Sequence, residues 1–214
     1  MSMESGLFDI IHSARAMRRL KPDPVPDDLI VKILEAGVAA ASGGNLQAWG
    51  FIVVKDRGIK ERVQHYYNRA FVEVVEPRYR TGVLPPGVTL EQYERQLGAV
   101  RYLTEHFHEA PVWIVACLSG GAAPPTRSSG GSIYPAVQNM LLAARALGLG
   151  ATLTTRHLVY EAEVEAVLGL PPGVHSYAIL PIGYPMGKFG PVRRAPLADV
   201  VYGDLWGQPY SALK

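Results

Sequence analysis

The sequence contains a single cysteine, Cys117, and this scarcity excludes two ways of stabilising a protein. One thiol can form neither an internal disulfide nor a cysteine metal cluster, so we expect a reducing compartment, the cytoplasm. The opening stretch MSMESGLFDI lacks the basic start and apolar stretch of a signal peptide. No apolar run approaches the roughly 18 residues of a transmembrane helix, so we expect no membrane-spanning segment.

The sequence also lacks an excess of either charge. Its 21 basic and 19 acidic residues give a net charge of +2, which provides no reason to expect nucleic acid or a membrane surface as a partner. The 214 residues suffice for one large domain or two small ones. Because no shift in composition marks a boundary and 48% of the residues are apolar, we expect a single domain, 1–214, with its own core.

Several catalytic motifs are absent as well. The sequence has no GxGxxG after its first predicted strand and no GxxxxGK[ST], so the usual dinucleotide and nucleoside-triphosphate loops are missing. It has neither the HExxH spacing of a metal site nor the GxSxG turn of a serine nucleophile. Cys117 lies in the apolar run PVWIVACL and is expected in the core. With no obvious nucleophile or metal site, the sequence favours a bound cofactor as the source of the chemistry.

Apolar periodicity and proline or glycine breaks predict helices that alternate with strands. Helices are expected at 7–17, 26–41, 58–79, 89–109, 133–150 and 161–169, and strands at 51–54, 112–118, 151–155 and 176–184. Residues 120–131, GGAAPPTRSSGG, are expected to form a loop, and Pro181 predicts that the last strand lies at an edge or ends there. The pattern indicates an α/β or α+β fold whose central sheet is covered by helices on both faces.

Two groups of arginines are candidate anion-binding residues. If the first helix continues through them, Arg15 shares a face with Arg18 and Arg19. Guanidinium forks suit a phosphate, because paired donors match its oxygens, whereas the alternative is a solvated basic face. Arg193 and Arg194 are either a surface pair in the C-terminal tail or a second part of the same cluster.

The stretch Ser42-Gly43-Gly44-Asn45, with Gln47 soon after, joins a predicted helix to a predicted strand. Glycine allows positive φ angles and close approach, so exposed amides and the serine hydroxyl would form a donor-rich concavity for an anion. A helix C-cap followed by a turn explains one glycine equally well. The local sequence leaves both interpretations open.

Three threonines, Thr152, Thr154 and Thr155, lie in the expected strand ATLTT. Hydroxyls and amides at a strand end can bind the polar edge of a ring. The β propensity of threonine also accounts for them, and on local grounds this second interpretation is the simpler one.

Five separated segments resemble the nitroreductase family of flavoproteins, in the family's order. The first is ARAMRRLKPDPVPDDLIVKILEAGVAAASGGNLQAWGFIVVKD, and the second is the AxQNxxLAAxxLGLG helix at 136–150. A strand with two threonines, PIGYP at 181–185 and an arginine before Pro-Leu in the tail follow. The resemblance leaves residues 58–110 largely uncovered.

The resemblance implies an α+β, three-layer (α/β) FMN fold with a central, mostly antiparallel sheet flanked by helices. It also implies a domain-exchanged homodimer in which each active site takes residues from both chains and a C-terminal extension embraces the partner. Residues 58–110 then correspond to a variable helical region over the active site. The implied cofactor is bound FMN, and the implied co-substrate is NADPH or NADH.

Carried over by position, the resemblance implies a set of FMN-binding residues. They are Arg15, Ala16, Arg18 and Arg19 from the first segment, Ser42, Gly43, Asn45 and Gln47 from the second chain's joint, Thr154 and Thr155 beside the ring, and Arg193 and Arg194, of which Arg194 is the better match for phosphate binding. Ala14 and Ala16 stand where many members have arginine and serine, so those phosphate contacts are expected to be weaker or to come from Arg15 and Arg19.

The implied reaction passes hydride from NAD(P)H through FMN to a nitro compound, quinone or similar small acceptor, with ping-pong kinetics. Arg18 is the candidate catalytic residue, because a positive charge beside the pyrimidine edge stabilises the reduced ring. The same scaffold also serves reductive dehalogenation, enoate reduction and flavin destruction. A non-catalytic FMN-binding protein and a dimeric scaffold with vestigial motifs are the remaining alternatives.

Overall fold

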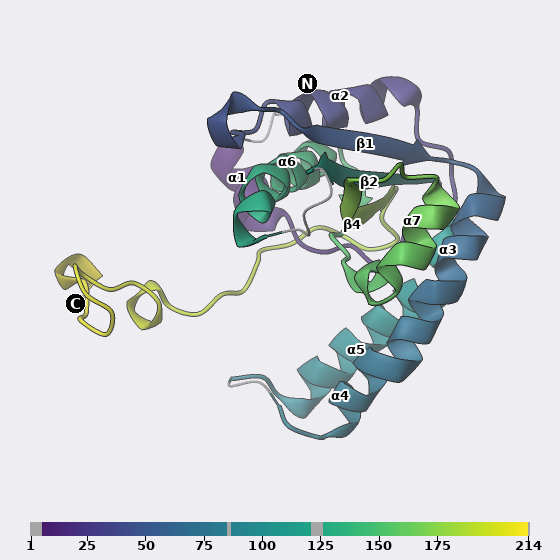
Figure 1. Ribbon diagram of the computed structural model, residues 1–214. Coiled ribbons are helices and arrows are strands. Elements are labelled where there is room, and N and C mark those ends of the chain that lie inside the picture. The colour runs from purple at the N-terminus through teal and green to yellow at the C-terminus, as the bar shows by residue number, and fades with distance from the viewer. Residues whose placement is uncertain (1–5, 85–86, 121–125, 214) are drawn as a thin grey trace, which may run out of the picture.

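The computed structural model describes residues 6–84, 87–120 and 126–213 (Figure 1). The helices are α1 (Leu7–Ser13), α2 (Asp27–Val38), α3 (Arg57–Ala70), α4 (Glu76–Arg80), α5 (Leu90–Glu105), α6 (Arg127–Ala146) and α7 (Glu161–Leu168). The strands are β1 (Trp49–Val54), β2 (Val112–Ser119), β3 (Gly150–Ala151) and β4 (Val174–Gly183). A π-helical turn, Phe71–Val75, joins α3 to α4.

The four described strands form one sheet in the order β1-β2-β4-β3, and every pair is antiparallel. Val115 of β2 lies opposite Ile52 of β1 on one side and Ile179 of β4 on the other. The two central strands are therefore β2 and β4, and the expected α+β fold with an antiparallel sheet is confirmed.

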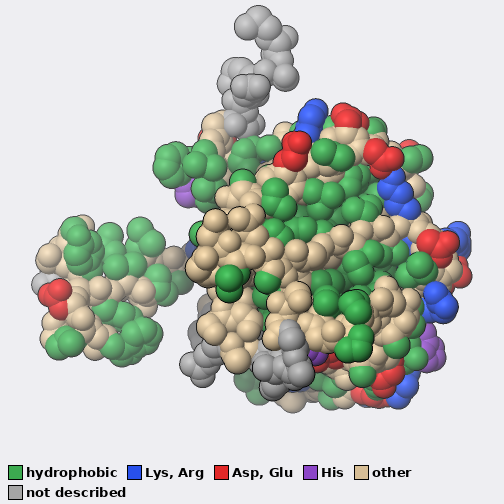
Figure 2. Space-filling view, turned by 45° about the horizontal axis from the view of Figure 1, so that its top comes forward, with side chains coloured by type: hydrophobic (Ala, Val, Ile, Leu, Met, Phe, Trp, Pro, Cys, Tyr) green, Lys and Arg blue, Asp and Glu red, His purple; other side chains and the backbone are tan. Residues whose placement is uncertain are grey.

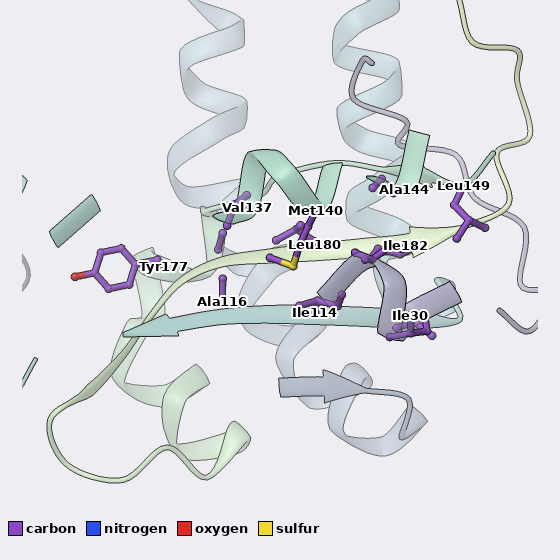
Figure 3. Close-up of a cluster of buried hydrophobic side chains, with 14 of the residues drawn as sticks. Ile30, Ile114, Ala116, Val137, Met140, Ala144, Leu149, Tyr177, Leu180 and Ile182 are labelled. Atoms are coloured by element: carbon purple, nitrogen blue, oxygen red, sulfur yellow. The ribbon is translucent and has the colours of Figure 1, made fainter. Parts of the chain in front are cut away.

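Each face of the sheet has its own hydrophobic core, because successive side chains of a strand point to opposite faces. In β2, Ile114 and Ala116 belong to the core beneath α2 and α6, a cluster that Figure 3 shows from the side. Trp113 and Val115 belong to the other core, which α3, α5 and α7 cover. Each fully buried aliphatic side chain contributes roughly 1.5–3 kcal/mol, so a strand buried on both faces is the main anchor of the fold.

Local signals explain where the helices begin and end. Pro26 precedes α2, and the acidic Asp27 and Asp28 occupy its first turn, where they favour the positive end of the helix dipole. The side chain of Asp56 caps α3 by accepting a hydrogen bond from the amide of Ile59. These signals set where the two helices begin, and their buried residues, among them Ile33 of α2 and Val63 of α3, face the sheet.

Pro181 marks the place where pairing on the β3 side of β4 is interrupted. Gly150 pairs with Gly183, and a lone bridge joins Thr154 to Ile179 in the same register. Pro181 lies between the two bridges and has no amide hydrogen to donate, so the ladder does not continue. The prediction of an edge or a strand end at Pro181 is wrong, because β4 is an interior strand and continues to Gly183, with Pro181 still paired to Trp113 of β2. The expected strand at 151–155 is reduced to β3 and the bridge.

The expectation that Arg15, Arg18 and Arg19 share a helical face is wrong, because α1 ends at Ser13. The chain continues in an extended conformation and packs across the β3 end of the sheet. The amide of Met17 donates to the carbonyl of Ala151 at 3.0 Å, and Met17 and Leu20 are buried. This backbone contact to the sheet replaces the helix, so side chains in the segment alternate instead of following a helical period.

Gly150 makes this close packing possible. A Cβ added there would lie 2.8 Å from Cδ2 of Leu20, closer than real Cβ atoms come to other atoms, and 3.0 Å from Cβ of Met17, which is tighter than most real contacts. Glycine therefore lets the extended segment approach β3 without a shift of Leu20 and Met17.

The region 58–110 is helical as expected, with α3, α4 and α5 extending away from the sheet (Figure 1). The expectation of a loop through residue 131 is wrong in its second half. Thr126 forms a capping box with Ser129, so α6 begins at Arg127, while residues 121–125 lie outside the described residues. Pro135 lies inside α6.

The C-terminal segment beyond Arg194 runs away from the sheet and the helices that cover it (Figure 1). Trp206 is 89% exposed and Leu205 is 64% exposed, and Figure 2 shows hydrophobic side chains gathered on this separate segment. Exposure of this size leaves an apolar surface without cover in a single chain. None of the helices in the described part of the chain has the length and apolar content that a membrane span needs.

Candidate active site

A cavity of about 530 Å³ lies where the end of α1 and the extended segment meet α6 and the segment after β4. Its lining consists of Ile11, His12, Ala14, Arg15, Ala16, Arg18, Gln138, Leu141, Arg145, Leu149, Ala151, Thr152, Leu153, Phe189, Val192 and Arg194. This volume is within the usual range for small-molecule and cofactor sites.

The cavity carries positive charge from four arginines, Arg15, Arg18, Arg145 and Arg194. No aspartate or glutamate is present among the described residues that line it. Like charges gathered around one space raise the local positive potential, and guanidinium groups present planar pairs of donors. The cavity is therefore suited to an anionic ligand.

The extended segment presents Ala16 and Arg18 to this cavity. Because its side chains alternate and Met17 is buried against the sheet, its two neighbours face the opposite way. Arg15 is held by a hydrogen bond from Nη2 to the carbonyl of Lys188 at 3.2 Å. Arg18 is half-buried and has no hydrogen bond or ion pair within the described ranges, so its donors are free for a ligand.

A buried group of polar side chains lies near Arg18. The hydroxyl of Tyr67 and Oγ1 of Thr154 are 2.9 Å apart, and the guanidinium carbon of Arg156 is 4.2 Å from the centre of the Tyr67 ring. Burial raises the pKa of the Tyr67 phenol, while the charges of Arg156 and Arg18 oppose this rise. Tyr67 therefore stays protonated near neutral pH and can donate to Thr154.

The joint between α2 and β1 adopts an unusual backbone. Gly44, Asn45 and Gln47 all have positive φ angles, of 57°, 54° and 49°. The Gln47 amide donates to Oγ of Ser42 at 2.9 Å, and Nε2 of Gln47 donates to Oδ1 of Asn45 at 3.1 Å. The amide of Gly43 donates to the Ser132 hydroxyl at 3.0 Å, which fixes the joint to α6. The joint is therefore more than a helix C-cap, because side chains hold its strained residues.

The structure brings some of the candidate residues together and leaves others apart. Arg15, Ala16, Arg18 and Arg194 line the cavity. The joint residues Ser42, Gly43, Asn45 and Gln47 do not line it, nor do Arg19, Thr154, Thr155 and Arg193.

Three of the residues outside the cavity have other surroundings. The guanidinium carbon of Arg19 lies 4.6 Å from the centre of the Tyr102 ring. Thr155 is exposed just before the turn Arg156–Tyr160, and Arg193 is exposed, with its carbonyl accepting a hydrogen bond from Arg194.

Sequence reasoning missed several lining residues, among them Arg145, Gln138 and Phe189. Arg145 had a signal that could have found it, since it is a lone cation in the apolar helix stretch MLLAARALGL. Thr152 lies in the same predicted strand as Thr154 and Thr155, but only Thr154 and Thr155 were predicted to lie beside the ring. Phe189 belongs to a tail segment with no periodic pattern, so its place depends on tertiary packing.

A second polar cluster is located on the other side of the sheet, under α7. Oε1 of Glu165 accepts hydrogen bonds from the amide and the hydroxyl of Ser176, at 2.6 and 3.0 Å. Nε2 of His157 lies 3.2 Å from the same hydroxyl, and burial lowers the pKa of His157 to about 4. Atoms of Glu161, Glu165 and His175 lie within 4.8 Å of one another. Since Glu165 is already engaged by Ser176, we assign this cluster to stability.

The family model and the solved structures that this chain matches define its class, an oxidoreductase enzyme with a nitroreductase-like fold. The chain belongs to the Nitroreductase family, whose sequence model matches residues 11–184. The family predicted from the separated segments is thus confirmed.

Relatives and solved structures agree with this assignment. The chain is 32% identical to an NADH dehydrogenase of Thermus thermophilus over 90% of this chain and 91% of that protein. It is 28% identical to an iodotyrosine deiodinase of Thermotoga neapolitana, over 84% of this chain and 88% of that one. It also resembles a crystal structure of oxidized iodotyrosine deiodinase bound to FMN and 3-iodo-L-tyrosine. The TM-score is 0.68 at 25% identity, over 89% of this chain and 95% of the other.

Proposed function

We propose that this protein is an FMN-dependent oxidoreductase that transfers hydride from NADH or NADPH to a nitro compound, a quinone or a similar small acceptor. The observation that carries the proposal is the cavity with four arginines and no described acidic lining residue. It is supported by the relatives named NADH dehydrogenase and by a structural neighbour whose crystals hold FMN.

The residues present fit FMN. A phosphate monoester carries about −1.5 to −2 charges near neutral pH and accepts hydrogen bonds from guanidinium forks. The apolar lining residues Leu149, Phe189 and Val192 offer surface for a flat ring. Bound FMN supplies the two-electron chemistry, and the protein supplies binding, orientation and electrostatics.

Each part of the chain then has a distinct task. Arg15 and Arg194 bind the phosphate, with Arg194 the better placed of the two adjacent tail arginines because it lines the cavity. Arg18, which has free donors, stabilises negative charge on the ring when electrons arrive. The helices of residues 58–110 select the acceptor that enters above the ring.

We further propose that the active unit is a homodimer, with the joint Ser42–Gln47 of one chain completing the cavity of the other. The exposed apolar side chains of the C-terminal segment support this, since a partner would cover them. Sedimentation of the full chain is expected to give twice the mass of one chain. A monomer that binds FMN with full affinity would contradict the shared site.

The proposed function is tested by purification and turnover. The purified protein is expected to be yellow, to release FMN on denaturation, and to consume NADH or NADPH when a quinone or nitroaromatic is added. A colourless preparation that ignores added FMN would refute the proposal. A yellow protein without steady NAD(P)H consumption would instead support a non-catalytic FMN-binding protein.

Reductive dehalogenation is a second candidate, favoured by the similarity to two iodotyrosine deiodinases. Release of iodide from 3-iodo-L-tyrosine by the chemically reduced protein would support it. If quinones and nitroaromatics turn over and iodide is never released, the first proposal stands alone.

A further inference from the structure

Arg145 is the cavity arginine that none of the sequence patterns selected. It lies in the last turn of α6, so it reaches the cavity from a different element than Arg15, Arg18 or Arg194. The extended segment offers only methyl groups at Ala14 and Ala16, so further side-chain donors for a ligand must come from elsewhere in the fold.

Arg145 is held in place from two directions. Its Nε donates to the hydroxyl oxygen of Ser13 at 3.0 Å, and its guanidinium carbon lies 4.1 Å from the centre of the Phe189 ring. The Ser13 hydroxyl donates in turn to the carbonyl of Asp9 at 2.6 Å, so its lone pairs are left for Arg145. The arginine is therefore oriented before any ligand binds.

This orientation leaves the outer donors of Arg145 unused. A guanidinium has five N–H donors, and only the one on Nε has a partner in the described part of the chain. The side chain is half-buried, and the described cavity lining holds no carboxylate. A partly desolvated cation without a counter-ion is costly, so an anion is the natural partner of this group.

The arginines are divided between two ends of the cavity. Arg15 and Arg145 both contact the same short segment, through the carbonyl of Lys188 and the ring of Phe189. Arg194 follows a few residues along that segment, whereas the charge of Arg18 acts on Tyr67. The end near Lys188 therefore concentrates more cationic donors, which suits the most highly charged part of a ligand.

We propose that Arg145 is a binding residue for the phosphate of the flavin mononucleotide, acting with Arg15 and Arg194. This inference rests on the proposed FMN-binding function. Ser13 is its positioning residue, because its hydroxyl oxygen accepts the hydrogen bond from Nε of Arg145. The two terminal nitrogens of Arg145 are then left to donate as a fork to the phosphate oxygens.

The test compares two flavins that differ only in the phosphate. Fluorescence titration of the apoprotein gives the Kd for FMN and for riboflavin in wild type and in Arg145→Met. We expect the variant to raise the Kd for FMN by about 10- to 100-fold, the range expected for a charge-assisted hydrogen bond, and to leave the Kd for riboflavin unchanged. Added salt should weaken FMN binding less steeply in the variant than in wild type.

Further variants separate binding from folding. Arg62→Met removes an exposed arginine of α3 and should leave both Kd values unchanged. Arg145→Lys keeps the charge and should lie between wild type and Arg145→Met, and Ser13→Ala should lose FMN affinity without losing riboflavin. These two variants carry the test if Arg145→Met fails to fold.

Two outcomes overturn the inference while the proposed function survives. One is equal weakening of FMN and riboflavin in the folded variants, which would indicate a merely structural role. The other is an unchanged Kd for FMN in Arg145→Met. If wild type binds neither flavin, the proposed function itself fails, and the assignment of Arg145 fails with it.

Discussion

Two polar regions on opposite sides of the sheet differ in how their charged side chains are paired. In the cluster under α7, the Glu165 carboxylate accepts twice from Ser176, and the same hydroxyl contacts His157. In the cavity, Arg18 has no hydrogen-bond or ion-pair partner among the described residues, and the one described hydrogen bond of the Arg145 side chain is to Ser13. Both regions are made from side chains that are costly to bury.

The difference separates groups that stabilise the fold from groups that await a ligand. A hydrogen-bonded buried cluster is costly to disrupt, because each lost partner leaves a buried donor or acceptor unsatisfied. Unpaired cations contribute little to folding and keep their donors for an anion. Changes in the first region should therefore move stability, and changes in the second should move ligand binding.

Glu165→Ala should have the largest effect, because it removes the acceptor of the hydrogen bonds from both the amide and the hydroxyl of Ser176. We expect the free energy of unfolding to fall by about 3 kcal/mol. Glu165→Gln keeps an acceptor and should lose less. Urea denaturation measures the loss, and the Kd for FMN of the folded fraction should not change. Weaker FMN binding with unaltered stability would contradict the assignment of the α7 cluster to stability.

Arg18→Ala should weaken FMN binding without lowering stability. Its half-buried side chain has no described partner to strand, so stability should be kept while FMN binds about 10- to 100-fold more weakly or is harder to reduce, by roughly 30–65 mV. Flavin fluorescence and redox titration measure the two effects. Arg57→Ala, an exposed residue of α3 paired with Glu61, is the control and should change neither. Equal effects in both variants would count against the assignment of Arg18.

Acid should destabilise the α7 cluster through His157. Its pKa is lowered by burial from 6.5 to about 4, so the unfolded chain binds more protons than the folded one between these values. The stability that neutral His157 contributes is complete above the unfolded pKa and is lost as the pH falls, by about 2 kcal/mol from pH 7 to pH 5. Urea melts at the two pH values measure this. An equal slope in His157→Gln would show that another group is responsible.

Tyr67→Phe should have the smallest effect, since it removes a single hydrogen bond. It removes the hydroxyl that lies 2.9 Å from Oγ1 of Thr154 but keeps the ring, which stacks on Phe107 at 4.2 Å. We expect a loss of about 1 kcal/mol, measured by urea denaturation. A loss as large as that of Glu165→Ala would mean that this hydrogen bond belongs to a more extensive network.

Much of the fold could be predicted from residue patterns because it depends on local chemistry. The apolar run 112–118 became a strand buried on both faces, and the start of α2 and the end of α7 lie beside the predicted proline and glycine. The extended segment was predicted as helix because apolar spacing near Ile10 and Ala14 is helical. Contact between Met17 and the backbone of Ala151 overrides that local preference.

The candidate site could be predicted only in part. Arg15, Ala16, Arg18 and Arg194 belong to motifs, and they line one cavity. Phe189 belongs to no motif, and Arg145 occupies only a variable position of the helix motif at 136–150. Both residues enter the site through packing rather than through their neighbours in the sequence. The joint Ser42–Gln47 lies outside the cavity of its own chain, so its proposed role depends on a second chain.

By itself, the sequence determined the layers of this protein and its membership of the Nitroreductase family, since apolar period, caps and motif order are local properties of the chain. The tertiary structure alone decided which charges face the cavity. Gly150 lets the extended segment pack against the sheet, and this packing turns Arg18 inward while α6 brings in Arg145. The direction of a side chain depends on what its backbone packs against, and that contact is made with residues far away in the sequence.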